Sequence, residues 1–405
     1  MTWKETSVLK LRTQFIKLYQ TKIMSISDLC REFGISRPTA YKFIRRFEQL
    51  GEDGLIDLPR RPNSHPNATP KDIVEFIVDL RTAHPHWSAP KMKLILERDY
   101  PMVDWPAHST IGSIIKNHGL VPKRRRKTAA CATPSHKLTY PDAPCSVWTA
   151  DFKGQFRLAS GEACYPLTIV DSYSRMILKC HGLLSPSFAS VLPQWVAVFR
   201  EHGLPAVIRT DNGSPFASIG LGGLSRLSAW WIRLGIMPER IQPGSPQQNA
   251  RHEQMHSVLK VQTAAPPKED LGEQQKAFDE FVEEYNNIRP HAGIGNATPA
   301  SLFIPSDRRY PLILPEIEYP SYMQIRHVRT DGSIKWKGRM PFVSEVLTGE
   351  CVGLDQIDDR LHALYYGPMP LAILDDHTGC WLPHKESALI IARLREESSH
   401  NITNV

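Results

Sequence analysis

The chain has 405 residues, of which 41% are hydrophobic and 22% charged, and its formal net charge is +7. This length fits about two to four domains, and the hydrophobic content excludes a globally disordered chain. The positive excess fits a polyanionic partner. We find neither a signal peptide nor an apolar run of about 18 residues, so we expect a cytoplasmic protein with no membrane partner. The seven cysteines include no Cys-x-x-Cys pair, which argues against a zinc knuckle or a redox motif.

Residues 1–62 are predicted to form a helix-turn-helix DNA-binding domain. A short helix over 27–33 precedes the turn Gly34-Ile35, and Ser36 is a good N-cap for the next helix. The alternative is an ordinary helical hairpin with a solvated basic face. If the first interpretation holds, four cations of the second helix contact DNA, namely Arg37, Lys42, Arg45 and Arg46.

Residues 63–128 are predicted to form a second helical DNA-binding domain that ends in a basic linker. Three helices are expected, starting near Thr69, after Trp87 and near Ser109. A simple connector bundle is the open alternative. The cationic run that follows is expected to track a DNA backbone, although such runs are usually solvated and flexible. It includes Lys123, Arg124, Arg125 and Arg126.

From Cys145 onward the pattern changes from helical to strand periodicity. The predicted order is β-β-β-α-β-α-β-α, and it indicates an RNase H-like core over residues 140–305, with a long helix at 271–288 on one face. The expected strands are 146–156, 164–171, 176–183, 206–210 and 237–242, and the expected helices are 188–202, one around Trp230 and one around Glu253.

The last part of the chain is predicted to be rich in short strands again. Residues 310–385 are interpreted as a small β-barrel with a hairpin turn at Asp331-Gly332. Its predicted strands are 322–328, 333–336, 350–354, 361–366 and 370–374, and its basic edge is Lys335, Lys337 and Arg339. Residues 386–405 are expected to form a terminal helix and a tail. The fold class is therefore multidomain α/β.

Three carboxylates lie where this topology would bring them together. Asp151 lies within the first core strand, Asp211 ends the fourth strand, and Glu253 lies on the helix beside them. Converged carboxylates repel one another unless cations neutralise them, and oxygen ligands select Mg²⁺ or Mn²⁺. Two such ions about 3.5–4 Å apart would serve phosphodiester chemistry. Taken singly, the same residues fit a strand edge, a turn and a solvated helix face.

The sequence around these carboxylates resembles the integrase-like DDE transposases of bacterial insertion sequences. The resemblance covers about residues 145–305, and the helical and β-rich flanks also fit the family architecture. It is carried by the segments 148–154, 209–216, 243–260, 285–291 and 298–300, which include Asp151, Asp211 and Glu253.

The resemblance implies a transposase that frees a 3′-OH at each element end and joins it to target DNA by transesterification. Asp151, Asp211 and Glu253 would be the catalytic metal ligands, and double-stranded DNA the partner. It also implies a bacterial, nucleoid-associated protein that acts as a homodimer or higher oligomer on DNA. Lys260 matches a DNA-contacting position of the family. Asn249, Arg251 and His256 are further expected DNA contacts beside Glu253.

The sequence departs from the family pattern at several places. The interval from Asp211 to Glu253 is long, Ala250 stands where glycine is common, and no His-His-Cys-Cys zinc domain precedes the core. None of these departures removes a predicted metal ligand. Two alternative functions stay open: a DNA-binding regulator with an inactive core, and an RNase H-like nuclease.

Overall fold

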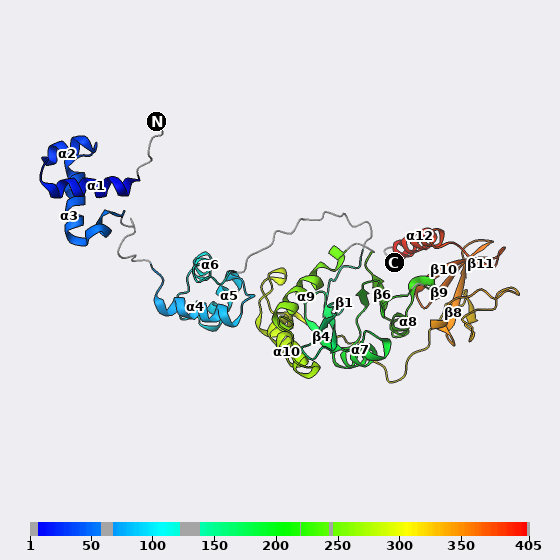
Figure 1. Cartoon of the computed structure of the whole chain (residues 1–405). Coiled ribbons are helices and arrows are strands. Elements are labelled where there is room, and N and C mark those ends of the chain that lie inside the picture. The colour runs from blue at the N-terminus through cyan, green and yellow to red at the C-terminus, as the bar shows by residue number, and fades with distance from the viewer. Residues whose placement is uncertain (1–6, 58–67, 122–137, 219, 243–245, 403–405) are drawn as a thin grey trace, which may run out of the picture. The chain divides into compact units, whose positions relative to one another are not determined.

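The chain falls into two compact units in a computed structural model (Figure 1). The units are Met1–Pro70 and Lys71–Val405, and each is described by itself. The structure describes residues 7–57, 68–121, 138–218, 220–242 and 246–402. The predicted cationic run from Lys123 to Arg126 therefore lies outside the described residues.

The first unit is a three-helix domain with a helix-turn-helix arrangement. Its helices are α1 (Val8–Thr21), α2 (Ile26–Glu32) and α3 (Arg37–Leu50), followed by the 3₁₀ turn η1 (Gly51–Leu55). The predicted cap is confirmed, because Ser36 Oγ accepts a hydrogen bond from Thr39 N at the start of α3. Gly34 takes a φ of 61° in the turn, a conformation that glycine adopts without strain. The domain core is Phe15, Ile16, Leu29, Phe43, Ile44 and Leu55.

The second unit begins with the three helices that the periodicity predicts. They are α4 (Lys71–Ala83), α5 (Ala89–Asp99) and α6 (His108–Asn117). Their shared core includes Ile77, Trp87, Met92, Ile95, Ile111 and Ile115. Arg81 is buried, and its guanidinium donates to the carbonyl oxygens of Trp87 and Leu120, which fixes the loops to α4. DNA binding by these helices stays a prediction.

A six-stranded mixed sheet forms the centre of the second unit. Its strand order is β2-β3-β1-β5-β6, with β4 also paired to β3. The central strand β1 pairs with β3 antiparallel and with β5 parallel, as an RNase H-like core requires. The strands are β1 (Val147–Phe152), β2 (Phe156–Arg157), β3 (Ala163–Asp171), β4 (Ile177–Leu183), β5 (Val207–Thr210) and β6 (Met237–Arg240). All five predicted core strands are present, and β2 is an additional short strand.

Helices cover both faces of this sheet, because successive side chains of β1 point to opposite faces. Trp148 and Ala150 pack with α7 (Phe188–His202) and α8 (Arg226–Arg233). Thr149 and Asp151 face α9 (Ala250–Thr263), and α10 (Leu271–Glu283) shares a second core with β3, β4 and α9. The π-helical segment η4 (Glu284–Ile288) continues α10, and the 3₁₀ turn η5 (Ala292–Ile294) and the short helix α11 (Pro299–Leu302) follow.

The C-terminal strands form an open sheet, and the predicted small barrel is not confirmed. Their order is β11-β10-β9-β8-β7, so β11 and β7 are the two edges. The strands are β7 (Gln324–His327), β8 (Cys351–Gln356), β9 (Leu361–Tyr366), β10 (Met369–Asp375) and β11 (Cys380–Trp381). The sheet buries its apolar face against Leu224, Ala229 and Ile232 at α8, and this packing takes the place of closure (Figure 1).

Two details of this region differ from the sequence-based expectation. The predicted strand at 333–336 is absent, and isolated bridges join Ser333 to Phe342 and Trp336 to Arg339. The predicted turn at Asp331-Gly332 is confirmed, since Gly332 N donates to Arg329 O. The terminal helix α12 spans His384–Ile402. Across the described ranges, we find no helix long and apolar enough to cross a membrane.

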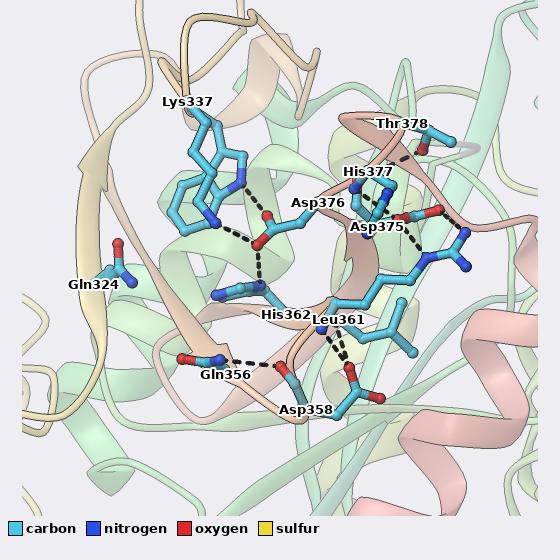
Figure 2. A network of polar contacts seen from close by, with 12 residues as sticks. Gln324, Lys337, Gln356, Asp358, Leu361, His362, Asp375, Asp376, His377 and Thr378 are labelled. Carbon is cyan, nitrogen blue, oxygen red and sulfur yellow. Dashed lines mark hydrogen bonds and ion pairs between the residues drawn. The ribbon is translucent and has the colours of Figure 1, made fainter.

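A network of acids and bases lies on the C-terminal sheet, and both of its aspartates are paired with cations (Figure 2). Asp376 accepts hydrogen bonds from Trp336 Nε1 and Lys337 Nζ, and His362 Nδ1 lies 3.4 Å from Asp376 Oδ2. Asp375 takes two hydrogen bonds from Arg360, at 2.8 and 2.6 Å. These cations keep the pKa of both aspartates below the usual range. The predicted basic residue Lys337 is thus partly neutralised within the fold.

Candidate functional site

Strand pairing places Asp151 and Asp211 side by side. In the parallel pair of β1 and β5, Ala150 lies opposite Thr210, so the next residues in register are the two aspartates. Asp211 is held by its own turn, because its Oδ1 accepts a hydrogen bond from Gly213 N at 3.0 Å. Asn212 Nδ2 ties the same turn to Ile241 O at 2.8 Å, at the end of β6. The two carboxylates therefore sit on a rigid sheet end.

The electrostatic environment of Asp151 reflects this placement. Burial first, then the charge of Asp211 and last that of Glu253, raise the pKa of Asp151 to about 7 against the opposing effect of Lys153. Its side chain remains one-fifth exposed, at 20%, so solvent reaches the carboxylate. A carboxyl group that titrates near neutrality, beside a second carboxylate, is the pattern of a site that lacks a counter-cation.

Glu253 approaches this pair without completing a cluster. It lies exposed in the first turn of α9, and its effect on the pKa of Asp151 ranks behind that of Asp211. In the part of the chain that the structure covers, no three His, Cys, Asp or Glu side chains lie close enough to hold a metal ion. The predicted convergence of three carboxylates is therefore incomplete.

Two buried histidines of α9 support the strand that carries Asp151. Thr168 Oγ1 donates to Asp151 O at 3.0 Å and lies 2.6 Å from Nε2 of both His252 and His256. A hydroxyl has one hydrogen, so both histidines must donate from Nε2. Thr149 Oγ1 lies 2.8 Å from His252 Nδ1, so both ring nitrogens of His252 have a hydrogen-bond partner. Burial lowers the pKa of His252 to about 3, which keeps that ring neutral.

His256 differs from its prediction. We expected it to contact DNA, yet it is only 3% exposed, and its Nδ1 lies 3.7 Å from Asp151 Oδ2. Its second nitrogen is taken by Thr168. The side chain therefore positions the strand of Asp151, and the expected direct contact with DNA is corrected. His252 is buried and hydrogen bonds within the core.

Lys260 lies exposed two turns along α9 from Glu253, as its spacing predicted. It lines a cavity of about 110 Å³ together with Lys153, which follows Asp151 by two residues. Sequence reasoning missed Lys153, which directly follows the end of β1. Lys153 acts electrostatically on Asp151, and Lys260 adds a second positive charge to the wall of that cavity.

Asn249 and Arg251 lie at the start of α9, and both line a cavity of about 350 Å³. Asn249 is buried, at 7% exposed, whereas Arg251 is exposed and its Nη1 lies 3.5 Å from Ser172 O. Asp151, Asp211 and Glu253 do not line this cavity. The predicted DNA contacts of Asn249 and Arg251 therefore belong to a different surface from that of the carboxylates.

The predicted DNA-contacting cations of the first unit fall into two groups. Arg37, Lys42 and Arg45 are exposed on α3, and Arg37 also hydrogen bonds Ser27 Oγ. Arg46 folds back, because its guanidinium donates to Ile56 O and lies over the Phe43 ring. Contact of these residues with DNA stays a prediction. Lys123, Arg124, Arg125 and Arg126 lie outside the described residues.

Comparison with protein families gives four matches along the chain. Residues 141–246 and 234–299 each match an integrase core domain. Residues 11–63 match a helix-turn-helix domain, and residues 39–115 match a homeodomain-like domain. The integrase core matches cover the segment that carries Asp151, Asp211 and Glu253.

Two curated relatives come from bacterial insertion elements. The 39.2 kDa protein of IS476 from Xanthomonas euvesicatoria is 28% identical over 228 residues, which is 55% of this chain and 62% of that protein. The 31.7 kDa protein of IS407 from Burkholderia multivorans is 27% identical over 197 residues, which is 48% of this chain and 68% of that protein. The chain thus spans less than two thirds of the first relative.

Solved structures with a similar arrangement include retroviral integrases. The HTLV-2 integrase catalytic core domain in complex with magnesium is 13% identical, covers 40% of this chain and 99% of its own, and gives a TM-score of 0.32. A simian T-cell lymphotropic virus intasome in complex with a PP2A regulatory subunit is 14% identical, covers 73% of this chain and 98% of its own, and gives 0.36. At such scores neither likeness supports a conclusion about this chain. Residues 141–299 are therefore similar to integrase core domains, residues 11–115 match helix-turn-helix and homeodomain-like domains, and the relatives include insertion-element proteins, as the motifs predicted.

Proposed function

We propose that this chain is a DDE transposase. It binds the ends of a mobile element, cleaves a phosphodiester bond there and joins the freed 3′-OH to target DNA by transesterification. The observation that carries the proposal is the pair Asp151 and Asp211, fixed side by side by strand register and left without a cationic partner strong enough to hold the pKa of Asp151 down. The integrase core matches and the insertion-element relatives support the same reaction class.

The residues present fit a divalent cation. Asp151, Asp211 and Glu253 offer only carboxylate oxygens, which suit hard ions such as Mg²⁺ or Mn²⁺. Burial is the largest cause of the raised pKa of Asp151, and a bound cation would relieve the repulsion by Asp211 that adds to it. We propose that these three residues hold two such ions, with Glu253 drawn toward the aspartates. When bound, the ions would supply charge stabilisation for the attacking and leaving oxygens of the phosphodiester.

Other residues of the site would orient the reacting groups. His252 and His256 hold Thr168, which in turn holds the backbone oxygen of Asp151 in place. Lys153 and Lys260 would attract the phosphates on either side of the scissile bond, since both line one cavity at this end of the sheet. The helix-turn-helix domain, with Arg37, Lys42 and Arg45 exposed on α3, would bind the element end.

A strand-transfer assay tests the proposal. The full chain is incubated with Mg²⁺, a target plasmid and labelled duplexes taken from the DNA that flanks the gene. We expect joined products that disappear with Glu253→Gln. The matched control is Glu280→Gln, which makes the same change at an exposed position of α10 and leaves joining intact.

The same assay separates the two other functions. Cleavage without joining would replace the transposase by an RNase H-like nuclease. Binding of the duplex without cleavage or joining would replace it by a DNA-binding regulator. Joining by Glu253→Gln at the wild-type rate would contradict the role of Glu253.

We also propose that the active form is a homodimer or a higher oligomer on DNA, because two element ends must be joined in concert. The mass of the complex with paired ends, measured by light scattering after gel filtration, tests this. Two or more protomers per pair of ends are expected. One protomer per pair would contradict the proposal.

A further inference from the structure

A cavity lined by cations lies where α9, η4 and the turn before β4 meet. Its charge is opposite to that of the carboxylates Asp151 and Asp211. It measures about 160 Å³. Lys91, Arg175, Arg251, Arg289 and His291 all line it. None of the described residues in its wall is an aspartate or a glutamate. Four residues that are formally cationic therefore surround one small space.

Two arginines of this cavity have buried N–H groups that lack hydrogen-bond acceptors. Arg289 is 8% exposed, and its Nε and Nη1 are buried without a partner. Arg175 Nε is also buried without a partner, although its Nη2 lies 3.4 Å from Gly293 O. An unpaired buried N–H is costly, and for a charged group the cost is larger. Such atoms indicate a missing acceptor.

The nearest acid does not supply that acceptor. Glu284 acts on Arg289 electrostatically, but its Oε1 accepts from Trp87 Nε1 at 2.8 Å and its Oε2 from Gln262 Nε2 at 3.3 Å. These two hydrogen bonds hold the start of α5 and the end of α9 against η4. The carboxylate of Glu284 therefore serves the packing of the fold, and the cavity keeps its positive charge.

Mutual repulsion among the cations agrees with this geometry. Burial first and the charge of Arg289 second lower the pKa of Lys91 to about 8. Burial also lowers the pKa of His291 to about 4, with Lys91 as the next cause. The charges that line the cavity thus disfavour one another in the absence of an anion.

We propose that this cavity binds one phosphate group of the DNA backbone, with Arg289 and Arg175 donating from within and Arg251 and Lys91 at its walls. Guanidinium groups match the tetrahedral oxygens of a phosphate with paired N–H donors. Two arginines with unused N–H groups and two more cations suit an oxyanion of this size. The inference rests on the proposed function for the identity of the nucleic acid. The cavity would be a phosphate site apart from the carboxylates, and so a second place at which the core binds DNA.

The test measures how DNA binding depends on salt. Each phosphate that is neutralised contributes about 0.9 to the slope of log K against log salt concentration for a duplex. Arg251→Gln and Arg289→Gln are each expected to lower the slope by about 0.9, in metal-free buffer, where joining cannot occur. Arg226→Gln is the matched control, because Arg226 is exposed on α8 and does not line the cavity.

A second measurement identifies the source of the phosphate. Inorganic phosphate, compared with chloride at equal ionic strength, is expected to raise the unfolding midpoint of the wild type and not that of Arg251→Gln. If Arg289→Gln does not fold, Arg251→Gln still decides both measurements, since Arg251 is exposed.

The outcomes separate this inference from the proposed function. Unchanged salt slopes in the cavity variants would overturn the inference, even if the wild type joins DNA. Stabilisation by inorganic phosphate with unchanged slopes would also overturn it, in favour of a free phosphate ligand. Lowered slopes in a wild type that never joins DNA would support the cavity and contradict the transposase.

Discussion

Asp151 at the end of β1 and the two aspartates of the C-terminal sheet have pKa values that are shifted in opposite directions. Asp375 and Asp376 are each met by a cation and by further N–H donors, and the pKa of each is lowered. Burial first, and then the charge of Asp211, raise the pKa of Asp151 to about 7. Both groups lie at strand ends, so secondary structure alone does not explain the difference.

The difference indicates which group is structural and which is functional. A paired network stabilises the fold and leaves no ligand atoms free. A pair of carboxylates held together without a counter-ion destabilises the fold, and such strain is typical of sites that bind a ligand. The cavity lined by Arg175, Arg251 and Arg289 repeats the second pattern with positive charge. On this account the two unpaired sites complement Mg²⁺ and a DNA phosphate.

The largest expected effect is on strand transfer. Asp211→Asn should lower the rate on the order of 10³-fold, because metal-bound charge stabilisation is worth several kcal/mol and about 1.4 kcal/mol is tenfold in rate. Asp376→Asn makes the same chemical change in the paired network and should leave the rate per folded molecule within about twofold. Equal losses in both variants would remove the distinction between the two groups of carboxylates.

A smaller effect is expected on stability in the network. Asp376→Asn removes the charge that Lys337 and Trp336 bind, so the unfolding midpoint should fall by several degrees at pH 7. The pKa of Asp376 is lowered in the fold, so its contribution is present above the pKa of the unfolded chain, about 3.8, and is lost as the pH falls through the folded value. Thermal unfolding of both proteins at pH 7 and pH 3 checks this, and an equal midpoint at pH 7 would refute it.

The carboxyl group of Asp151 should change the stability with pH in the opposite direction to that of Asp376. Its pKa is raised from 3.8 to about 7 in the fold, so the folded state holds a proton between these values that the unfolded state has lost. Stability therefore falls as the pH rises through this window. Without metal at pH 8, Asp151→Asn should be more stable than the wild type by about 1–2 kcal/mol, after allowance for solvent screening. Urea unfolding at pH 8 and pH 4 measures the gain, which should vanish at the lower pH. A loss of stability at pH 8 would contradict the repulsion.

The sequence predicted most of the core because its strands are short, apolar and separated by clear turns. The register of Asp151 and Asp211 follows from strand order and strand ends, so their adjacency was predictable. The position of Glu253 was less predictable, because a helix can carry the right residue and still lie too far from the sheet for that side chain to join the aspartates. The open C-terminal sheet was missed because its apolar face packs on α8, a contact between segments more than 100 residues apart.

The cavity on the other side of α9 had no sequence signal of its own. Arg175 comes from a turn in which it takes a φ of 67°, and Arg289 from a segment that follows α10. Single arginines in such places are ordinary surface residues. Only the tertiary fold brings them together and buries their N–H groups. Lys153 was missed for a simpler reason, since the strand pattern was used to place Asp151 and not the residue that follows the end of β1.

The most direct test of the central claim is calorimetric titration of Mn²⁺ into the metal-free chain at pH 6, 7 and 8. If Asp151 and Asp211 are held unpaired for a divalent cation, affinity should rise with pH through about 7, with proton release on binding, as Asp151 loses its proton. Asp151→Asn should abolish the rise in affinity with pH and the proton release, whereas Asp376→Asn should change neither of these. Binding that is independent of pH and unchanged in Asp151→Asn would contradict the account.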